Sequence, residues 1–206
     1  VCSGTLFSYT ATSSNSSTTM SWTRAVVPGI SNTIGTSTSG NISETLINTT
    51  SAPIEVVYVY TLTLNGCTNT QSVRVTVNPN DILLNTPTAI EICSGSVFNF
   101  VPTTSINTTV FSWNRGTVIG TAPTINETLI NNGNSSVNFT YNYKLTTTEG
   151  CVSPTRSFTV TVHPTPKLIN ITQTSFCTPL NAPITFEYTP QTNLTGVVVS
   201  WSRASN

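Results

Sequence analysis

The sequence predicts an all-β protein built from tandem Ig-like antiparallel β-sandwich repeats. Segments such as Val137-Asn-Phe-Thr-Tyr-Asn-Tyr-Lys-Leu145 alternate apolar and polar residues with the period of two that is typical of half-buried strands. Thr, Ser and Asn wet the surface in place of charges, which make up only 7% of residues, and β-branched threonine favours strands. The same motifs also return in the same order along the chain, which is typical of a repeat architecture.

The repeated unit from Asn80 to Pro164 spans 85 residues. Its opening Cys-Ser-Gly motif occurs at Cys2 and Cys93, with a looser copy at Cys177. A Trp-x-Arg segment, a Glu-Thr-Leu-Ile-Asn block, a Tyr-x-Tyr strand and a Val-Thr-Val-x-Pro end follow in the same order. We therefore expect residues 1–79 to be a repeat without its first strand, 80–164 to be a complete repeat, and 165–206 to be the N-terminal part of a third.

The strands of each repeat are expected to form two antiparallel sheets packed face to face. Asn65-Gly66 is a two-residue hairpin signal that joins the Tyr strand to the Val strand, since both residues tolerate positive φ. The tryptophans lie in phase with the apolar rows of their strands, so we expect core positions and not open platforms for sugar rings. The expected core aromatics are Trp22, Trp113, Trp201, Tyr58, Tyr60, Tyr141 and Tyr143.

One arginine and one glutamate recur at inward-facing positions of each repeat. Because an unpaired inward charge is costly, we expect Arg24 to pair with Glu44, and Arg115 to pair with Glu127. A glutamate acting as a general acid or base would need a second carboxylate or a histidine nearby, and the sequence offers few. These residues are therefore interpreted as structural ion pairs.

Charge and motifs exclude several function classes. Seven basic residues balance seven acidic ones, which favours neither nucleic acid nor an anionic membrane as a partner, and no apolar stretch is long enough for membrane insertion. The single histidine, His163, and the single aspartate, Asp81, cannot build a metal or catalytic cluster by themselves. We expect no cofactor and no enzyme activity. Because the chain begins at Val1 without a methionine or a leader, we expect an internal piece of a secreted protein.

Five cysteines without metal-type spacing indicate cystines and an oxidising location outside the cell. Repeat register suggests bonds from Cys2 to Cys67 and from Cys93 to Cys151. In an Ig-like sandwich, however, the turn before the second strand and the last hairpin lie ~20 Å apart, whereas a disulfide needs α-carbons within ~7 Å. We therefore prefer a bond between neighbouring repeats, Cys2 to Cys151, which leaves Cys67, Cys93 and Cys177 for copies outside this chain. Such bonds would stiffen a string of repeats into a rod.

The motifs resemble PKD-like repeats of very large surface proteins of Bacteroidota, including gliding-motility adhesins of the SprB type. The resemblance is carried by the Ile-Cys-Ser-Gly segment from Ile92 to Pro102, by Phe111 to Arg115, and by the block that ends in Val-Thr-Val-x-Pro. Trp113-Asn-Arg-Gly116 departs from the Trp-Asp-Phe-Gly-Asp-Gly segment of ordinary PKD domains, so their calcium-type roles are not carried over. The resemblance implies type IX secretion, display on the outer cell surface, and adhesion or gliding.

Three functions are compatible with the sequence. The leading one is a structural or adhesive stalk of a giant adhesin, whose partners are neighbouring repeats, the type IX and gliding machinery, and an unknown surface or polysaccharide. The alternative is an accessory carbohydrate-binding or spacer module of a secreted polysaccharide hydrolase. A receptor ectodomain is the third, because Asn-x-Ser/Thr sequons occur at Asn48, Asn107, Asn126 and Asn138. The number of repeats in the full-length protein would separate the first two.

Overall fold

The computed structural model of the chain describes residues 1–106, 109–171, 175 and 183–204. Those residues form thirteen strands joined by turns, without a helix. α-Carbon contacts divide the chain into two compact units: Val1–Pro87, Phe100–Ile125 and Tyr141–Phe158 form the first, and Thr88–Asn99, Asn126–Thr140 and Thr159–Asn206 form the second.

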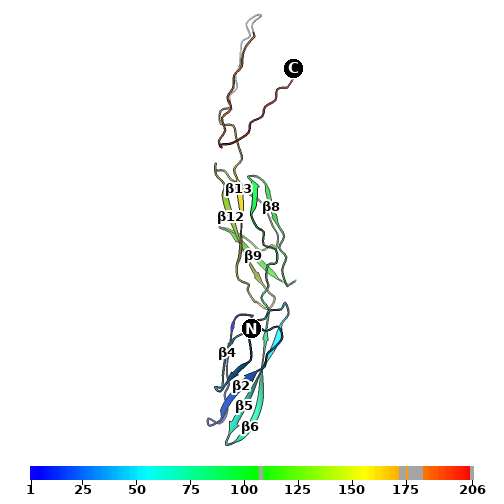
Figure 1. Cartoon of the computed structure of the whole chain (residues 1–206), viewed down its shortest axis with the longest axis vertical. Coiled ribbons are helices and arrows are strands. Elements are labelled where there is room, and N and C mark those ends of the chain that lie inside the picture. Colours follow the sequence, from blue (N-terminus) through cyan, green and yellow to red (C-terminus); the bar gives the residue numbers. More distant parts are fainter. Residues whose placement is uncertain (107–108, 172–174, 176–182, 205–206) are drawn as a thin grey trace. The chain divides into compact units, whose positions relative to one another are not determined.

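The first sandwich lies entirely within the first unit. A four-stranded sheet of order β3-β2-β5-β6 faces a two-stranded sheet, β1-β4; β2, β5 and β6 run side by side in Figure 1. The edge-to-face contact between Trp22 and Tyr58 and the ring contact of Phe7 with Tyr58 fill the space between the sheets. The strands are β1 Leu6–Thr10, β2 Thr19–Arg24, β3 Gly35–Ser37, β4 Asn41–Thr45, β5 Ile54–Leu64 and β6 Cys67–Val77.

The hairpin between β5 and β6 confirms the turn predicted from Asn65-Gly66. The two strands pair from Ile54 opposite Val77 to Leu64 opposite Cys67, so only two residues form the loop. Asn65 has φ 50° and Gly66 has φ 82°, the left-handed values that a tight antiparallel hairpin requires. This turn fixes which face of β5 and β6 carries the buried row.

The strands of the second repeat form a five-stranded sheet of order β10-β9-β12-β13-β7 and a two-stranded sheet, β11-β8. Within the first unit, Phe100 of β8 contacts Tyr143 of β12 and Phe158 of β13, with ring centroids 5.7 and 5.0 Å apart. Within the second unit, β7 and β13 pair in parallel. The strands are β7 Ile90–Cys93, β8 Val97–Phe100, β9 Val110–Arg115, β10 Val118–Gly120, β11 Ile125–Thr128, β12 Val137–Thr146 and β13 Arg156–His163.

Six of the seven aromatic residues predicted for the core are buried: Trp22, Trp113, Tyr58, Tyr60, Tyr141 and Tyr143. The prediction is wrong for Trp201, whose surface is 87% exposed. Residues 165–206 contain no counterpart in sequence of the Tyr and Val strands on which Trp22 packs, and among the described residues no sheet covers this ring. A strand with the correct period still needs a partner sheet in order to bury its apolar row.

The opening segment of the expected third repeat bonds in the same way as that of the second. Leu83 bridges Thr104 in antiparallel fashion, and Leu168 bridges Thr192 in the same way. In both copies an asparagine two residues after the leucine donates its side-chain amide to the facing segment: Asn85 bonds the Val101 carbonyl and Asn170 bonds the Thr189 carbonyl. The domain boundaries at 79 and 164 remain predictions.

Candidate functional site

A disulfide joins Cys2 to Cys151, with the two α-carbons 5.4 Å apart. The preferred pairing is therefore confirmed, and the register-based pairings of Cys2 with Cys67 and of Cys93 with Cys151 are wrong. Cys67 and Cys93 are free thiols at exposed positions. Cys177 lies outside the described residues. The bond connects the opening turn of the first repeat with the β12–β13 turn of the second.

Short turns hold both cysteines in place. The Ser3 amide donates to the Asn78 carbonyl over 2.8 Å, and the Gly4 amide donates to the Leu46 carbonyl over the same distance. On the other side the Thr147 amide donates to the Cys151 carbonyl, and Gly150 takes a positive φ of 80° that closes the turn. The Cys151 side chain is fully buried.

A serine and an asparagine clamp the cysteine turn of the first repeat to the end of its last strand. The Asn48 amide donates to the Ser3 hydroxyl over 2.9 Å, and that hydroxyl donates to the Asn48 carbonyl. The Asn48 side-chain amide donates to the carbonyls of Ala52 and Val77, and its oxygen accepts from the Thr50 amide. Asn48 is buried, and all its polar atoms serve the fold, which argues against this sequon as a glycan site.

The second repeat has the same clamp. The Asn131 amide donates to the Ser94 hydroxyl, and the Asn131 side chain donates to the carbonyls of Ser135 and Val162. This clamp was not predicted, although the sequence carries a signal for it. The serine that follows each cysteine and the asparagine that ends each Glu-Thr-Leu-Ile-Asn block recur in both copies.

The predicted pair of Arg24 and Glu44 is present, and it links the two sheets of the first sandwich. The Arg24 Nε lies 2.9 Å from Glu44 Oε2, and a second guanidinium nitrogen lies 3.1 Å from Oε1, which makes the contact bidentate. Arg24 is 1% exposed. The Tyr58 hydroxyl donates to Glu44 Oε2 over 2.6 Å, and Arg24 also donates to the Thr33 carbonyl. The tyrosine's role in this network was not predicted.

The network fixes the charge states of its members. Burial works against ionisation of Glu44, but hydrogen bonds from Arg24 and Tyr58 outweigh it and hold the pKa of this carboxyl below its usual range. The hydrogen bond to Glu44 raises the pKa of Arg24. Burial, followed by the bond to Glu44, raises the pKa of Tyr58 far above that of a free phenol. The site is locked as carboxylate, guanidinium and neutral phenol, so it offers no proton for acid–base chemistry near neutral pH.

The corresponding pair in the second repeat, Arg115 with Glu127, stays a prediction. The Arg115 guanidinium lies 5.9 Å from the centre of the Tyr141 ring, which occupies the position of Tyr58. The two copies also share a tyrosine bond: the Tyr60 hydroxyl donates to the Gly40 carbonyl over 2.9 Å, and the Tyr143 hydroxyl donates to the Pro123 carbonyl over 2.6 Å. Burial raises the pKa of Tyr143 to about 12.

A comparison with protein families matches the PKD-like domain at residues 1–81 and again at residues 90–166. The chain belongs to the PKD-like domain family. No curated protein matches the chain.

Solved structures resemble these PKD-like repeats more distantly. Extracellular domains 3–5 of Drosophila OTK match with a TM-score of 0.41 and 9% identity, over 80% of this chain and 58% of that one. A three-Ig structure of titin domains I67–I69, an E-to-A variant, matches with a TM-score of 0.38 and 8% identity. The match covers 80% of this chain and 61% of that one. Drosophila N-cadherin domains EC1-4 match with a TM-score of 0.30 and 11% identity, over 78% of this chain and 46% of that one. The chain spans less than two thirds of each of them.

The remaining titratable candidates of the PKD-like repeats have structural partners. Asp81 is fully buried and accepts hydrogen bonds from the Ser105 hydroxyl, from the Ile106 amide and from Thr109. His163 ends β13, with its Nε2 3.1 Å from Glu91 Oε2. Among the described residues no group of three metal-ligating side chains lies together. No described helix is long and apolar enough to cross a membrane.

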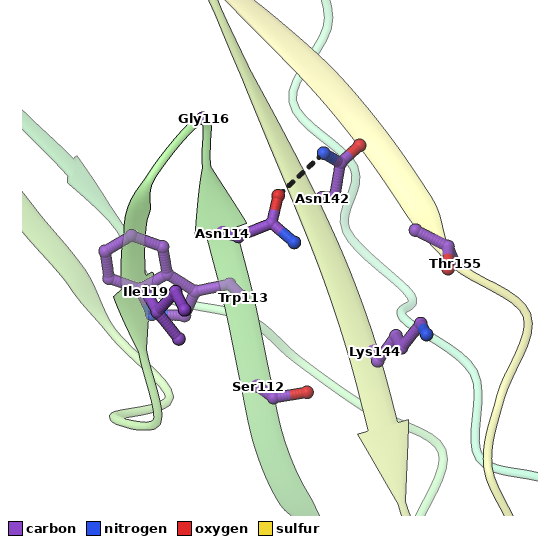
Figure 2. Close-up of a pocket in the computed structure, with 8 residues that line it drawn as sticks. All are labelled: Ser112, Trp113, Asn114, Gly116, Ile119, Asn142, Lys144 and Thr155. Atoms are coloured by element: carbon purple, nitrogen blue, oxygen red, sulfur yellow. Dashed lines mark hydrogen bonds between the residues drawn. The ribbon is translucent and has the colours of Figure 1, made fainter.

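A shallow hollow of about 500 Å³ lies on the polar face around Trp113 (Figure 2). The Asn142 side chain donates to Asn114 there over 2.9 Å, and Lys144 borders the same hollow. The indole of Trp113 is buried and donates to the Ala122 carbonyl. This face offers amide and ammonium groups to a ligand, but no open aromatic ring for a sugar to stack on.

Proposed function

We propose that these PKD-like repeats are stalk segments of a large secreted adhesin on the outer cell surface, where they serve adhesion or gliding motility. The observation that supports this most is the Cys2–Cys151 bond, because it ties one repeat covalently to the next. Disulfides persist outside the reducing cytosol, which fits export, for which the type IX system is the route we propose. The partners are neighbouring repeats, the gliding machinery and an unidentified surface or polysaccharide.

The bond changes how a pulled chain carries tension. Cys2 and Cys151 lie 149 residues apart in sequence. Force applied at the two ends passes from Cys2 through the sulfurs to Cys151, so the chain between them bears none of it. An extended residue adds ~3.3–3.6 Å, so the bond withholds about 500 Å of chain from stretching. A stalk with such bonds keeps its length even when its sandwiches unfold.

The surface and the core fit the same role. Few charges and zero net charge leave no long-range field to attract a charged substrate. The ionised groups within the first core bind one another, which stabilises the sandwich and leaves no reactive centre there. The carbohydrate-binding form of the alternative function has less support, since Trp22 and Trp113 are both buried.

Single-molecule stretching of the full chain from its two ends tests the proposal. We expect the oxidised protein to reach a contour length about 500 Å shorter than the same protein in a reducing buffer. A Cys2→Ser variant should show the long contour length in both buffers, whereas Cys67→Ser should behave like the parent. Equal lengths for the oxidised and reduced parent would show that the bond carries no tension, and the stalk proposal would lose its support.

A further inference from the structure

Cys93 and Cys67 occupy the same places in their repeats as the two bonded cysteines. Cys2 and Cys93 each precede a Ser-Gly turn, and each lies in parallel register with the end of a last strand, Cys2 opposite Asn78 and Cys93 opposite His163. Cys67 and Cys151 each follow a glycine with positive φ in the turn before the last strand. The chain therefore carries one bonded pair and one unbonded copy of each half of that pair.

A hollow of about 460 Å³ lies next to Cys93 in the second unit. It is bordered by Ser94, Gly95, Ile130, Asn131 and Thr165, among others. The equivalent surface of the first repeat is more covered: Ser3 is 7% exposed where Ser94 is half-buried, and Ile47 is 38% exposed where Ile130 is 51% exposed. The position with a bonded partner is thus the less accessible of the two.

We propose that this hollow receives the Asn65-Gly66-Cys67 hairpin of a second copy of the chain, which is then locked by a Cys93–Cys67 disulfide. This inference rests on the proposed stalk function and adds to it the partner, a second copy of the chain, and the surface that binds this partner, the hollow next to Cys93. The contact joins two different surfaces, so copies add head to tail and the assembly stays open at both ends.

The shape and the charge of the Asn65-Gly66-Cys67 hairpin are compatible with binding in this hollow. Asn65 and Gly66 hold a tight two-residue turn, and the side chain after it is the exposed thiol of Cys67. Residues 65–73 carry no charge, so the hairpin meets no like-charge repulsion from Lys167, the one charged side chain among the described residues that line the hollow. The Ile130 side chain offers apolar surface for the hairpin to bury.

The redox step needs an oxidant, which we take to be a low-molecular-weight disulfide. The Cys67 thiolate attacks it, forms a mixed disulfide and releases one small thiol. The Cys93 thiolate of the copy that holds the hollow then displaces the other small thiol and forms the Cys93–Cys67 bond. Two protein thiols are oxidised, and the small disulfide takes up the two electrons and two protons as two thiols.

The experiment uses the full chain in a Cys177→Ser background, incubated with oxidised and reduced glutathione. We expect a ladder of oligomers on a non-reducing gel, with Cys67–Cys93 peptides in the digest. Adding Cys67→Ser or Cys93→Ser should leave monomers, whereas a mixture of the two single variants should stop at a dimer. Monomers only, or Cys67–Cys67 and Cys93–Cys93 bonds in place of the mixed one, would overturn the inference. The Cys2–Cys151 bond is untouched by these changes, so the stretching result stands independently.

A second pair of variants distinguishes docking of the hairpin in the hollow from oxidation of exposed thiols without docking. Ile130→Glu places a charge in the hollow and should slow oligomer formation about tenfold, since a buried unpaired charge opposes docking. Ile119→Glu is the matched control, because Ile119 is an exposed isoleucine of β10 outside the hollow. Equal rates for the two variants would contradict docking at Ile130.

Discussion

At the scale of single residues, the protein buries polar groups only together with their partners. Arg24, Asn48 and Asp81 are each less than a tenth exposed, and all three have hydrogen-bond partners from other segments of the chain. Within the described residues no buried side-chain nitrogen or oxygen lacks a partner. Such groups are costly when one partner is removed, so they are the sensitive points of the fold.

Removal of the Glu44 charge should destabilise the first sandwich strongly. Glu44→Gln leaves the buried Arg24 guanidinium without a counter-ion, a change that costs about 3–5 kcal/mol. Urea unfolding followed by tryptophan fluorescence measures it. Glu55→Gln is the matched control, because the Glu55–Arg74 pair is more than half exposed and should contribute less than about 1 kcal/mol. Similar losses in both variants would contradict a special role for the buried pair.

The Glu44 carboxyl should also make the free energy of unfolding depend on pH in the acidic range. In the folded state the pKa of Glu44 lies below its ordinary value of 4.5, so the unfolded chain takes up a proton more readily. The contribution is therefore complete well above pH 4.5 and is lost as the pH falls through the folded pKa. Unfolding free energies measured between pH 6 and pH 2 should fall less steeply for Glu44→Gln than for the parent. Parallel curves would argue against the lowered pKa.

The asparagine clamp should matter more than its exposed neighbour. Asn131→Ala removes two donors from the Ser135 and Val162 carbonyls and should cost about 1–3 kcal/mol. Asn132→Ala, at the exposed next position, should be close to neutral. Thermal unfolding of both variants measures the difference. A neutral Asn131→Ala would mean that water replaces the lost bonds.

At the scale of elements, the turn of the β5–β6 hairpin requires a left-handed backbone at Asn65 and Gly66. A Cβ at Gly66 would meet nothing within 4 Å, so Gly66→Ala tests the positive φ without a clash. We expect a loss of about 1–2 kcal/mol in unfolding free energy, the usual cost of a left-handed conformation for a residue with a side chain. Asn65→Gly, which relaxes the other turn residue, should change stability by less than Gly66→Ala does. The reverse order would contradict the turn assignment.

The features that depend on residues close together in the sequence could be predicted from it. Alternation predicted the strands, Asn65-Gly66 predicted the hairpin, and the parity of Arg24 and Glu44 predicted an inward pair that the structure places in contact. The asparagine clamp, which depends on bonds between segments that are far apart in the sequence, was missed, as was the burial of Asp81. The prediction for Trp201 was wrong for a different reason. The alternation of apolar and polar residues predicts which face of a strand a side chain occupies, but it does not show whether another sheet covers that face.

At the scale of the whole molecule, the Cys2–Cys151 bond makes the covalent connectivity testable with one cut. A protease site inserted at the exposed segment 86–89 lies inside the loop closed by this bond. After cleavage the two fragments should run together on a non-reducing gel and separate after reduction. Bonds within each repeat, Cys2 to Cys67 and Cys93 to Cys151, would instead let the fragments part without reductant. A Cys2→Ser variant, which also releases the fragments, shows that cleavage is complete, so only a bond across the repeats explains fragments that stay joined in the parent.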